Sequence, residues 1–274
     1  MFIGWLKFAD VAQAVKIAES VGWLADGYHI KLMLMHNITH CYGAYDGDKL
    51  IGAIMAIGYE KSAMIKYFAV AKEYQRQGIG KRLFNTLYNV LNTEYPYLYL
   101  HANPELQTFF EGYGFEKKFE VGRFVNVGKV PPFHFTNAHA KELDSNDFDT
   151  VAKHIDYETF AENRMEFLID EMDRNSSLKF ATKNGFMHSS VVNARNVYLG
   201  PWQVRQGHHV EAEKMMQGVL FFRGLKKIIA DVPLEQKHIV DLYKNYNFEK
   251  KATFLHMANN NREIKYENIY SFSL

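Results

Sequence analysis

The chain has 274 residues, enough for two domains of the commonest size, which is about 100–150 residues. Its 32 Lys and Arg residues balance 31 Asp and Glu residues, so net charge gives no argument for nucleic acid or a membrane surface as partner. The single cysteine, Cys41, excludes an intramolecular disulfide, and no apolar run reaches the about 18 residues of a membrane span, so we expect a soluble, cytoplasmic protein.

The first predicted element is a helix over Val11–Val21, whose apolar residues recur at helical spacing. Asp10 stands at its N-cap position, and Gly22 ends it. The following stretch, Trp23–His40, fits either a short helix or an apolar loop, and its boundaries stay open.

From Cys41 onward the pattern changes to strands. The turn Asp46-Gly47-Asp48 joins two apolar strands into a predicted hairpin, and a further strand follows. The rest of the first half alternates helices and strands. In chain order the predicted elements are strands at 42–45, 50–59 and 64–70, a helix at 80–93, a strand at 97–101, a helix at 104–112 and a strand at 116–124.

The stretch Gln75–Lys81 lies between a strand and a helix and carries two glycines, Gly78 and Gly80. The first N–H groups of a helix have no partner inside it, and the helix dipole favours an anion there. Neither G-x-G-x-x-G nor G-x-x-x-x-G-K-[ST] fits the spacing. The stretch therefore predicts a phosphate-binding loop of another type, with an ordinary strand-to-helix turn as the alternative.

This loop resembles the GNAT acetyltransferase motif Q/R-x-x-G-x-G/A. A second stretch, Asn103–Phe115, is similar to the later family signature N-x-x-A-x-x-x-Y-x-x-x-G-F, and the order of elements also resembles that family. The resemblance covers residues 10–124. It implies an α/β fold of the mixed α+β kind, a mostly antiparallel sheet flanked by helices, with acetyl-CoA as co-substrate and no metal.

The resemblance also implies which residues hold acetyl-CoA. Backbone groups of Phe68 and Val70 would pair with the pantetheine arm, and loop amides would bind the phosphates. Arg76 would add a charge-assisted contact, unless it is only an exposed loop arginine. The full set of implied cofactor positions is Phe68, Val70, Gln75, Arg76, Gln77, Gly78, Ile79, Gly80, Lys81, Asn103 and Phe110.

The catalytic groups are less evident. Many family members have a tyrosine general acid at the position of Phe110, which has no proton to donate, although a thiolate with a pKa of about 8.5 can leave unassisted. Tyr113 is the nearest substitute, or a packing residue. Glu60 and His101 are candidate bases, with a solvated turn residue and a hydrogen-bonded strand end as alternatives.

No metal site is expected. His36, His40 and Cys41 lie close in the sequence, but a fourth ligand is missing. Cys41 lacks any recognisable activation as a nucleophile, and a buried small residue is the better interpretation.

The clearest break in the chain is the turn-rich stretch 128–132, where two prolines follow each other. Beyond it the sequence repeats the first half, at an offset of 129 from Phe68 and Val70 (Val197 and Leu199) to Gly78 (Gly207), and of 133 near Phe115. We therefore predict a GNAT acetyl-CoA-binding domain at 1–128, a linker at 129–133, and a divergent GNAT-like domain with a C-terminal tail at 134–274.

The two halves differ at the loop. At the offset of 129, Gly80 falls on His209, and the next helix carries Glu211 and Glu213 in its first turn. Carboxylates there satisfy the helix dipole and repel a phosphate. We therefore predict one acetyl-CoA site, in the first half, and a second half that packs against the first or walls its substrate pocket.

The sequence thus predicts an N-acetyltransferase that moves acetyl from acetyl-CoA to a primary amine by direct attack. Balanced charge favours a small amine or amino acid as acceptor, and a longer acyl donor stays possible. The alternative, motivated by Phe110 and the divergent second half, is a CoA-binding sensor or scaffold with little or no turnover.

Overall fold

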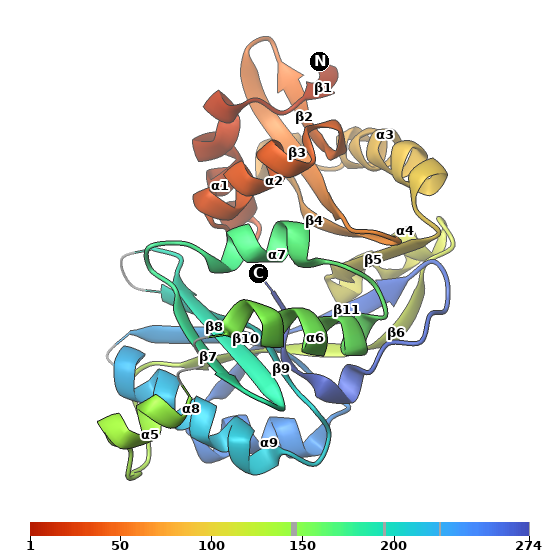
Figure 1. Ribbon diagram of the computed structural model, residues 1–274. Helices are drawn as coiled ribbons and strands as arrows, with labels where there is room; N and C mark the ends of the chain where they lie inside the picture. Colours follow the sequence, from red (N-terminus) through yellow and green to blue (C-terminus); the bar gives the residue numbers. More distant parts are fainter. Residues whose placement is uncertain (144–146, 194–195, 225, 274) are drawn as a thin grey trace. The chain divides into compact units, whose positions relative to one another are not determined.

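The computed structural model describes residues 1–143, 147–193, 196–224 and 226–273. Its contacts divide the chain into two compact units. Both are mixed α/β, and each has a mixed, mostly antiparallel sheet with helices packed on it, as the sequence predicted (Figure 1). Unit 1 comprises Met1–His101, Phe109–Glu116 and Met257–Asn261, and unit 2 comprises Ala102–Thr108, Lys117–His256 and Arg262–Leu274.

Unit 1 contains strands in the order β1-β2-β3-β4-β5. Their bounds are β1 Phe2–Trp5, β2 Cys41–Asp46, β3 Lys49–Gly58, β4 Ser62–Val70 and β5 Tyr97–Ala102. The helices are α1 Val11–Ser20, α2 Gly27–His36, α3 Ile79–Glu94 and α4 Gln107–Glu111, with short 3-10 turns at Phe8–Asp10, Ile38–His40 and Lys72–Tyr74. A further 3-10 turn, Pro104–Leu106, falls in unit 2.

The predicted hairpin forms as β2 and β3, joined at Gly47, whose φ of 58° suits glycine. Helices α1 and α2 cover one face of these strands and α3 the other (Figure 1). Helix α3 buries Leu83, Leu87 and Leu91 completely, because their spacing of four residues puts them on one helical face. The open stretch Trp23–His40 forms α2.

Two local expectations need correction. Asp10 does occupy the N-cap position of α1, but its carboxylate accepts from the Lys7 amide and the Tyr45 hydroxyl instead of a helix N–H. A 3-10 turn directly before α1 directs the side chain there. Strand β1, which pairs with β2, was not predicted, because its short apolar run has no turn signal on either side.

Unit 2 contains strands in the order β11-β6-β10-β9-β8-β7, with β12 paired to β9. Its strands are β6 Glu116–Asn126, β7 Leu178–Thr182, β8 Gly185–Val191, β9 Asn196–Val204, β10 Lys227–Pro233, β11 Glu249–Ala258 and β12 Ile269–Ser271. Its helices are α5 Asn137–Glu142, α6 Phe148–Phe160, α7 Met165–Met172, α8 His209–Arg223, α9 Lys237–Asn245 and a 3-10 turn at Tyr266–Asn268.

Strand β6 is grouped differently from our expectation. We assigned it to the first half, but it pairs with β10, and the half-buried Arg123 on β6 makes a bidentate ion pair of 2.8 and 2.7 Å with Asp231 on β10. Conversely, the end of β11 belongs to unit 1, where the Asn259 amide donates to the Leu98 carbonyl. The boundary at 129–133 stays a prediction about the sequence repeat.

Among the described residues, no helix combines the length and apolar character needed to cross a membrane.

Candidate cofactor site and acyl-transfer centre

The loop between β4 and α3 is tied to the end of β4. The Gln75 side-chain amide donates to the Val70 carbonyl at 2.9 Å, and the Gln77 side-chain amide donates to the Glu73 carbonyl at 3.2 Å. These two glutamines therefore shape the loop with their side chains. Their backbone groups are therefore the parts expected to contact a ligand.

The start of α3 is an open anion site. Gly78, at the N-cap, has a left-handed φ of 79°, and a Cβ there would meet nothing within 4 Å. Helical bonding begins when the Arg82 amide donates to the Gly78 carbonyl, so the amides of Ile79, Gly80 and Lys81 have no acceptor inside the helix. No acidic residue stands in the first turn. The geometry suits a phosphate.

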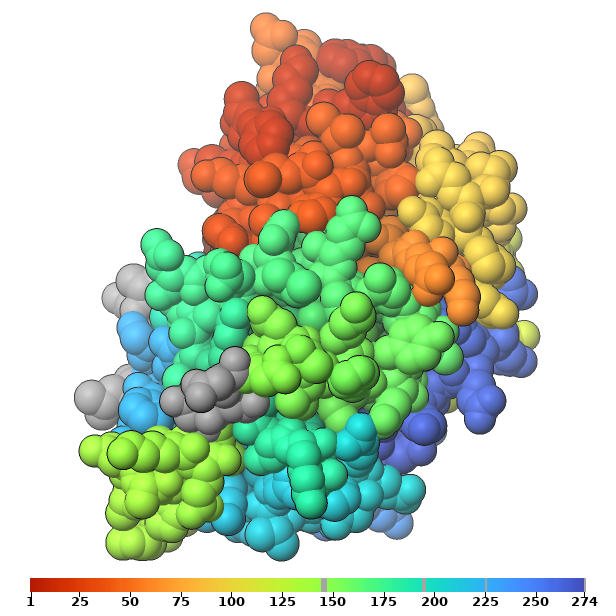
Figure 2. All heavy atoms as spheres, viewed as in Figure 1, coloured from red at the N-terminus to blue at the C-terminus, as the bar shows by residue number. Residues whose placement is uncertain are grey.

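The cationic side chains nearby are exposed. Arg76, with φ 60°, and Lys81 both extend from the loop into solvent. Figure 2 shows the outer face of α3, coloured gold, at the surface of the molecule. A charged ligand can therefore reach this end of the helix without displacing packed side chains.

Beside the loop, β4 runs on past its last pair with β5. The parallel pairing extends from Ser62 to Ile65, while β4 continues to Val70, and β3 and β5 are its only neighbours in the described sheet. We call residues Lys66–Val70 the β4 edge, because they lie beyond Ile65, where the register with β5 ends. An extended chain such as a pantetheine arm fits such an edge by accepting and donating strand-like hydrogen bonds.

Phe68 and Val70 lie on the β4 edge and face the start of α3. A Cβ on Gly80 would lie 3.4 Å from the Phe68 ring and 3.8 Å from a Val70 methyl carbon, which is ordinary van der Waals contact, so both side chains lie directly against the start of α3. The structure thus brings together Phe68, Val70 and the loop 75–81, as the sequence predicted. Their contact with acetyl-CoA stays a prediction.

A β-bulge interrupts the β4 edge. Register shifts between Ala53 and Met55 of β3, so that Tyr67 and Phe68 together oppose Ile54. Tyr67 adopts a left-handed φ of 52°, which is rare for a residue with a Cβ. Its hydroxyl lies 2.8 Å from Nδ1 of His29 on α2, in a buried hydrogen bond.

Sequence reasoning missed the pair of His29 and Tyr67. His29 lies in the stretch left open between helix and loop, and no pattern places it beside a residue 38 positions away. A hydrophobic run that contains one histidine was the only available signal. A bulge in the middle of a strand has no sequence marker when no glycine is present.

Phe110 belongs to an aromatic cluster and is only 3% exposed. Its ring centroid lies 5.3 Å from that of Phe84 and 6.2 Å from that of Phe68, in edge-on contacts. Phe109 and Tyr113 pack against the same rings. Phe110 therefore supports the β4 edge from the α3 side and offers no acidic proton.

Tyr113 is directed to α3. Its hydroxyl donates to the Asn85 side-chain carbonyl, its ring packs 4.7 Å from Phe84, and burial raises the pKa of Tyr113 above its ordinary value. These contacts fit the packing role that was the alternative for this residue.

The remaining candidates are spread out. Glu60 is exposed in the turn between β3 and β4, at the opposite end of the hairpin from Val70, about 25–30 Å away at the rise of a strand. His101 follows Leu100, the last β5 residue paired with β4, so it stands where the two strands part. Asn103 falls in unit 2, at the start of a 3-10 turn. The geometry does not bring Glu60 to the loop.

No group of three metal-ligating side chains occurs among the residues that the structure describes. His40 instead contacts Glu94 at 2.7 Å, through its Nε2 atom. Cys41 is fully buried, donates to the Asn37 carbonyl, and burial raises the pKa of its thiol to about 12. An inert thiol agrees with the sequence interpretation of Cys41.

In unit 2 the corresponding strand is β9, and the structure corrects our alignment of it. The β9 register shifts opposite His188, so its bulge lies at Gly200–Pro201. The bulges therefore relate Phe68 to Pro201, an offset of 133, and not to Val197. Because Pro201 has no N–H, it cannot donate to a ligand as Phe68 can. The offset of 129 still relates Gly78 to Gly207, because both glycines have left-handed φ values, 79° and 88°.

The loop of unit 2 is also shorter. Residues 71–78 separate β4 from α3, but only residues 205–208 separate β9 from α8. The first turn of α8 holds Glu211, as predicted, but Glu213 lies beyond it, because the helix begins at His209. The Glu211 carboxylate accepts from Thr182 and from Asn184. Those bonds lower the pKa of Glu211 against the opposing effect of burial. A second phosphate would meet this carboxylate.

The C-terminal segment occupies the edge of β9. Strand β9 pairs with β10 only from Asn196 to Tyr198, and β12 pairs antiparallel with β9 beyond that point. The Ser271 hydroxyl donates to the Leu199 carbonyl at 2.6 Å, and the Phe272 amide donates to the Asp231 carbonyl of β10 at 3.0 Å. The place equivalent to the β4 edge is therefore filled by the protein itself.

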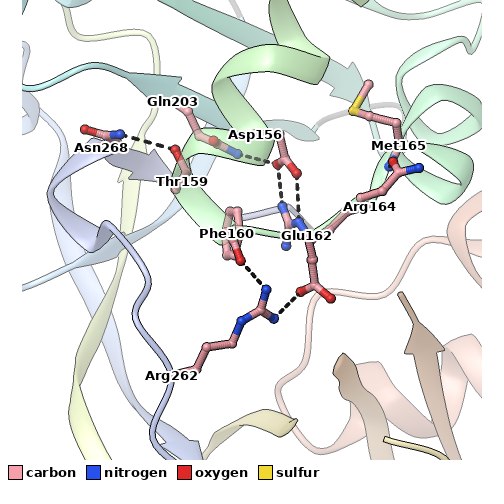
Figure 3. A network of polar contacts seen from close by, with 10 residues as sticks. Asp156, Thr159, Phe160, Glu162, Arg164, Met165, Gln203, Arg262 and Asn268 are labelled. Atoms are coloured by element: carbon pink, nitrogen blue, oxygen red, sulfur yellow. Dashed lines mark hydrogen bonds and ion pairs between the residues drawn. The ribbon is translucent and has the colours of Figure 1, made fainter. Parts of the chain in front are cut away.

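A buried polar network, drawn in Figure 3, holds the same segment against α6. Arg262 pairs with Glu162 at 2.7 Å and donates to the Phe160 carbonyl, and the Asn268 amide donates to the Thr159 hydroxyl at 3.3 Å. At its centre Asp156 accepts two bonds from Arg164, of 3.0 and 2.7 Å, and a third from Gln203 at 2.7 Å. The network anchors both the tail and β9.

Comparison with known proteins agrees with this geometry. The family described as "Acetyltransferase (GNAT) domain" matches residues 25–130, which include α2, the β4 edge, the loop and α3. The likeness to the GNAT acetyltransferase domain therefore covers the part of the chain that holds the candidate site. No curated protein matches the chain significantly.

Solved structures extend the likeness to the whole chain. A protein from Pyrococcus horikoshii, assigned provisionally as an acetyltransferase, is 20% identical with a TM-score of 0.82, over 99% of this chain and 93% of that one. A GCN5-related N-acetyltransferase from Sphaerobacter thermophilus is 12% identical with a TM-score of 0.64, over 94% of each chain. A tandem GNAT protein from the clavulanic acid biosynthesis pathway is 11% identical with a TM-score of 0.64, over 96% and 99%. The chain thus has the tandem GNAT fold.

Proposed function

We propose that this protein is an N-acetyltransferase that binds one acetyl-CoA, in unit 1, and transfers the acetyl group to a primary amine by direct attack. The carrying observation is the junction of the β4 edge, the loop and α3. There, orphan amides, a left-handed Gly78 and a first helical turn without acids coincide. The orphan amides and Gly78 suit a phosphate, and the β4 edge suits the pantetheine arm.

The single-site part of the proposal is supported by unit 2. Its loop is short, Glu211 occupies the first turn of its helix, and β12 covers the edge of β9. Each feature opposes a second cofactor. We propose that unit 2 supports unit 1 and has no acyl-transfer chemistry of its own.

The acceptor is proposed to be a small amine or an amino acid. Balanced charge over the chain, 32 basic against 31 acidic residues, gives no sign of a strongly charged macromolecular acceptor. The direct mechanism needs a group that removes a proton from the attacking nitrogen, and the thiolate of CoA, with a thiol pKa of about 8.5, leaves without an acid. The buried Phe110 is compatible with that route.

The same residue supports a second candidate, a CoA-binding sensor or scaffold without turnover. Phe110 offers no proton, and the Tyr113 hydroxyl donates its hydrogen bond to Asn85. Titration calorimetry with acetyl-CoA, followed by CoA thiol release in a panel of small primary amines and amino acids, separates the two. Binding of one acetyl-CoA with turnover supports the enzyme, binding without turnover supports the sensor, and no binding contradicts both.

A further inference from the structure

Strand β1 forms the edge of the unit 1 sheet. Strand β2 is its only neighbour among the strands that the structure describes (Figure 1). An uncovered edge presents main-chain groups to other chains, and proteins usually guard it with charged residues or prolines. The stretch Met1–Leu6 contains neither. By contrast β7, at the other end of the strand order, carries Lys179, which pairs with Asp173 at 3.4 Å.

The main-chain groups at this edge follow from the pairing of β1 with β2. The Leu6 amide donates to the Cys41 carbonyl at 2.9 Å, next to the last of the four pairs in the β1–β2 register. Main-chain groups alternate in direction along an antiparallel strand. Every second residue counted back from Leu6, which includes Gly4, therefore bonds to β2. Ile3 and Trp5 direct their amides and carbonyls to the outer side.

The side chains of β1 are exposed on both faces of the sheet. Phe2 is 53% exposed and stacks on Tyr45 with ring centroids 5.0 Å apart, and Trp5 is 62% exposed. These two aromatic residues are three positions apart, so they lie on opposite faces. Met1 and Phe8 extend the exposed apolar surface at the two ends of the strand. A helix laid on one face would cover one aromatic side chain, whereas a strand added in the plane of the sheet lies beside both.

We infer that this strand is β1 of a second copy of the chain, paired antiparallel across a two-fold axis at Gly4. In that register Ile3 lies opposite Trp5 of the second copy, and the same pair recurs on the other side of the axis. A β-branched residue opposite an aromatic one is a favourable cross-strand pair. At the axis glycine meets glycine, so no side chain separates the strands.

The same register matches the main-chain groups. The outward amides and carbonyls of Ile3 and Trp5 face those of Trp5 and Ile3 in the second copy, as a ladder requires. The Trp5 carbonyl already accepts from the Tyr45 hydroxyl at 3.2 Å, and its second lone pair serves the ladder. Contacts of this kind use one patch on both copies, so they close as a dimer.

The size of the contact fits a weak, reversible dimer. With about 200 Å² for an aromatic side chain, the exposed parts of Phe2 and Trp5 amount to roughly 230 Å² per copy. Met1, Phe8 and the short strand backbones add to this area, but the total stays below the about 1,200–2,000 Å² of stable interfaces. The pairing is therefore expected to depend on protein concentration.

Sedimentation velocity of the full chain over increasing concentration tests the pairing. Half of the chains should be paired at a concentration on the order of 10–100 µM, as for other small interfaces. Trp5→Lys, which removes the aromatic partner of Ile3 and adds a charge at the edge, should weaken pairing at least about tenfold. The matched control is Phe221→Lys, at a 48% exposed aromatic residue on α8 of unit 2, which should leave pairing unchanged.

Cysteine substitutions test the register. Opposed residues that share no hydrogen bonds have Cα atoms about 4.5 Å apart, within disulfide reach, so Gly4→Cys should give a cross-linked dimer on mild oxidation. A Cβ there would lie 3.3 Å from the ring of Phe2, an exposed side chain that can turn aside. Ile3→Cys is the control, because its counterpart lies diagonally about 7–8 Å away and should cross-link far less. The natural Cys41 is buried.

Each result decides the proposal. A monomer at every concentration up to several hundred micromolar overturns it. Pairing that persists in Trp5→Lys, or is lost in Phe221→Lys instead, places the contact elsewhere and also overturns it. Cross-linking of Ile3→Cys as fast as that of Gly4→Cys rejects the two-fold axis at Gly4. Weakened pairing in Trp5→Lys together with selective cross-linking at Gly4→Cys supports it.

Discussion

Gly78→Glu is the most direct test of the phosphate loop, because unit 2 offers a matched control. Gly78 and Gly207 both have left-handed φ values, 79° and 88°, and a Cβ at either position meets nothing within 4 Å. Each stands within two residues of a helix start. Glutamate at the two positions therefore introduces the same charge and comparable strain.

The expected effect on affinity follows from charge. A carboxylate about 6 Å from a phosphate, at an effective dielectric constant of about 20, is repelled by roughly 3 kcal/mol per unit charge. This corresponds to about a hundredfold loss of acetyl-CoA affinity. The strain of a left-handed residue, about 1–2 kcal/mol, is present with and without ligand and lowers stability more than affinity.

The assay is titration calorimetry with acetyl-CoA at two salt concentrations, together with thermal unfolding. Gly78→Ala isolates the strain and should bind nearly as well as wild type. Gly78→Glu should lose affinity about a hundredfold, and part of that loss should disappear at high salt, because exposed charges are screened. Gly207→Glu should leave affinity unchanged.

An affinity of Gly78→Glu within about threefold of wild type would refute the site assignment. A loss in Gly207→Glu as large as that in Gly78→Glu would refute the single site, since it would place a phosphate at both loops.

Three further predictions concern stability and reactivity. Arg262→Ala leaves Glu162, which is 1% exposed, buried without its ion-pair partner, and should lower the unfolding free energy by about 3–5 kcal/mol in a denaturant titration. The control Arg205→Ala breaks an exposed ion pair and should lower it by less than about 1 kcal/mol. Burial lowers the pKa of His188 from 6.5 to about 3, so below pH 6.5 the unfolded chain binds a proton that the folded protein does not, and the unfolding free energy falls with pH down to about 3. Between pH 7.5 and 5.5 the wild type should lose about 1 kcal/mol in this way, and His188→Gln should not show that loss. Cys41 should resist an aromatic disulfide reagent in the native protein and react fully in urea, and rapid native labelling would contradict its burial.

Much of the local structure was predictable from the sequence. Helix α3 and the hairpin of β2 and β3 matched to within a few residues, because apolar spacing and turn glycines act on neighbouring residues. The loop at Gly78 was predictable for the same reason, since a left-handed N-cap before a helix favours glycine wherever it occurs. Asp10 shows the limit: its position was right, but its hydrogen-bond partner lies on another element.

The candidate site divides in the same way. Most of the residues expected to hold acetyl-CoA, Phe68, Val70 and the loop 75–81, are close in the sequence and lie together at the β4 edge, whereas Asn103 falls in unit 2. The expected catalytic residues came from separate parts of the chain, and Glu60 lies at the far end of its hairpin. Which distant side chains meet depends on strand register, and a bulge that shifts register by one residue leaves no mark in the sequence.

The sequence by itself determined that this chain has a glycine-bearing loop before a helix, a GNAT-like order of elements, and a second copy that lacks the second glycine of that loop. Only the tertiary structure decided that Tyr67 meets His29, that β6 pairs with β10, and that β12 covers the edge of β9. The first group rests on backbone preferences within a few residues. The second rests on pairings between segments tens of residues apart, whose hydrogen bonds exist only once the chain has folded.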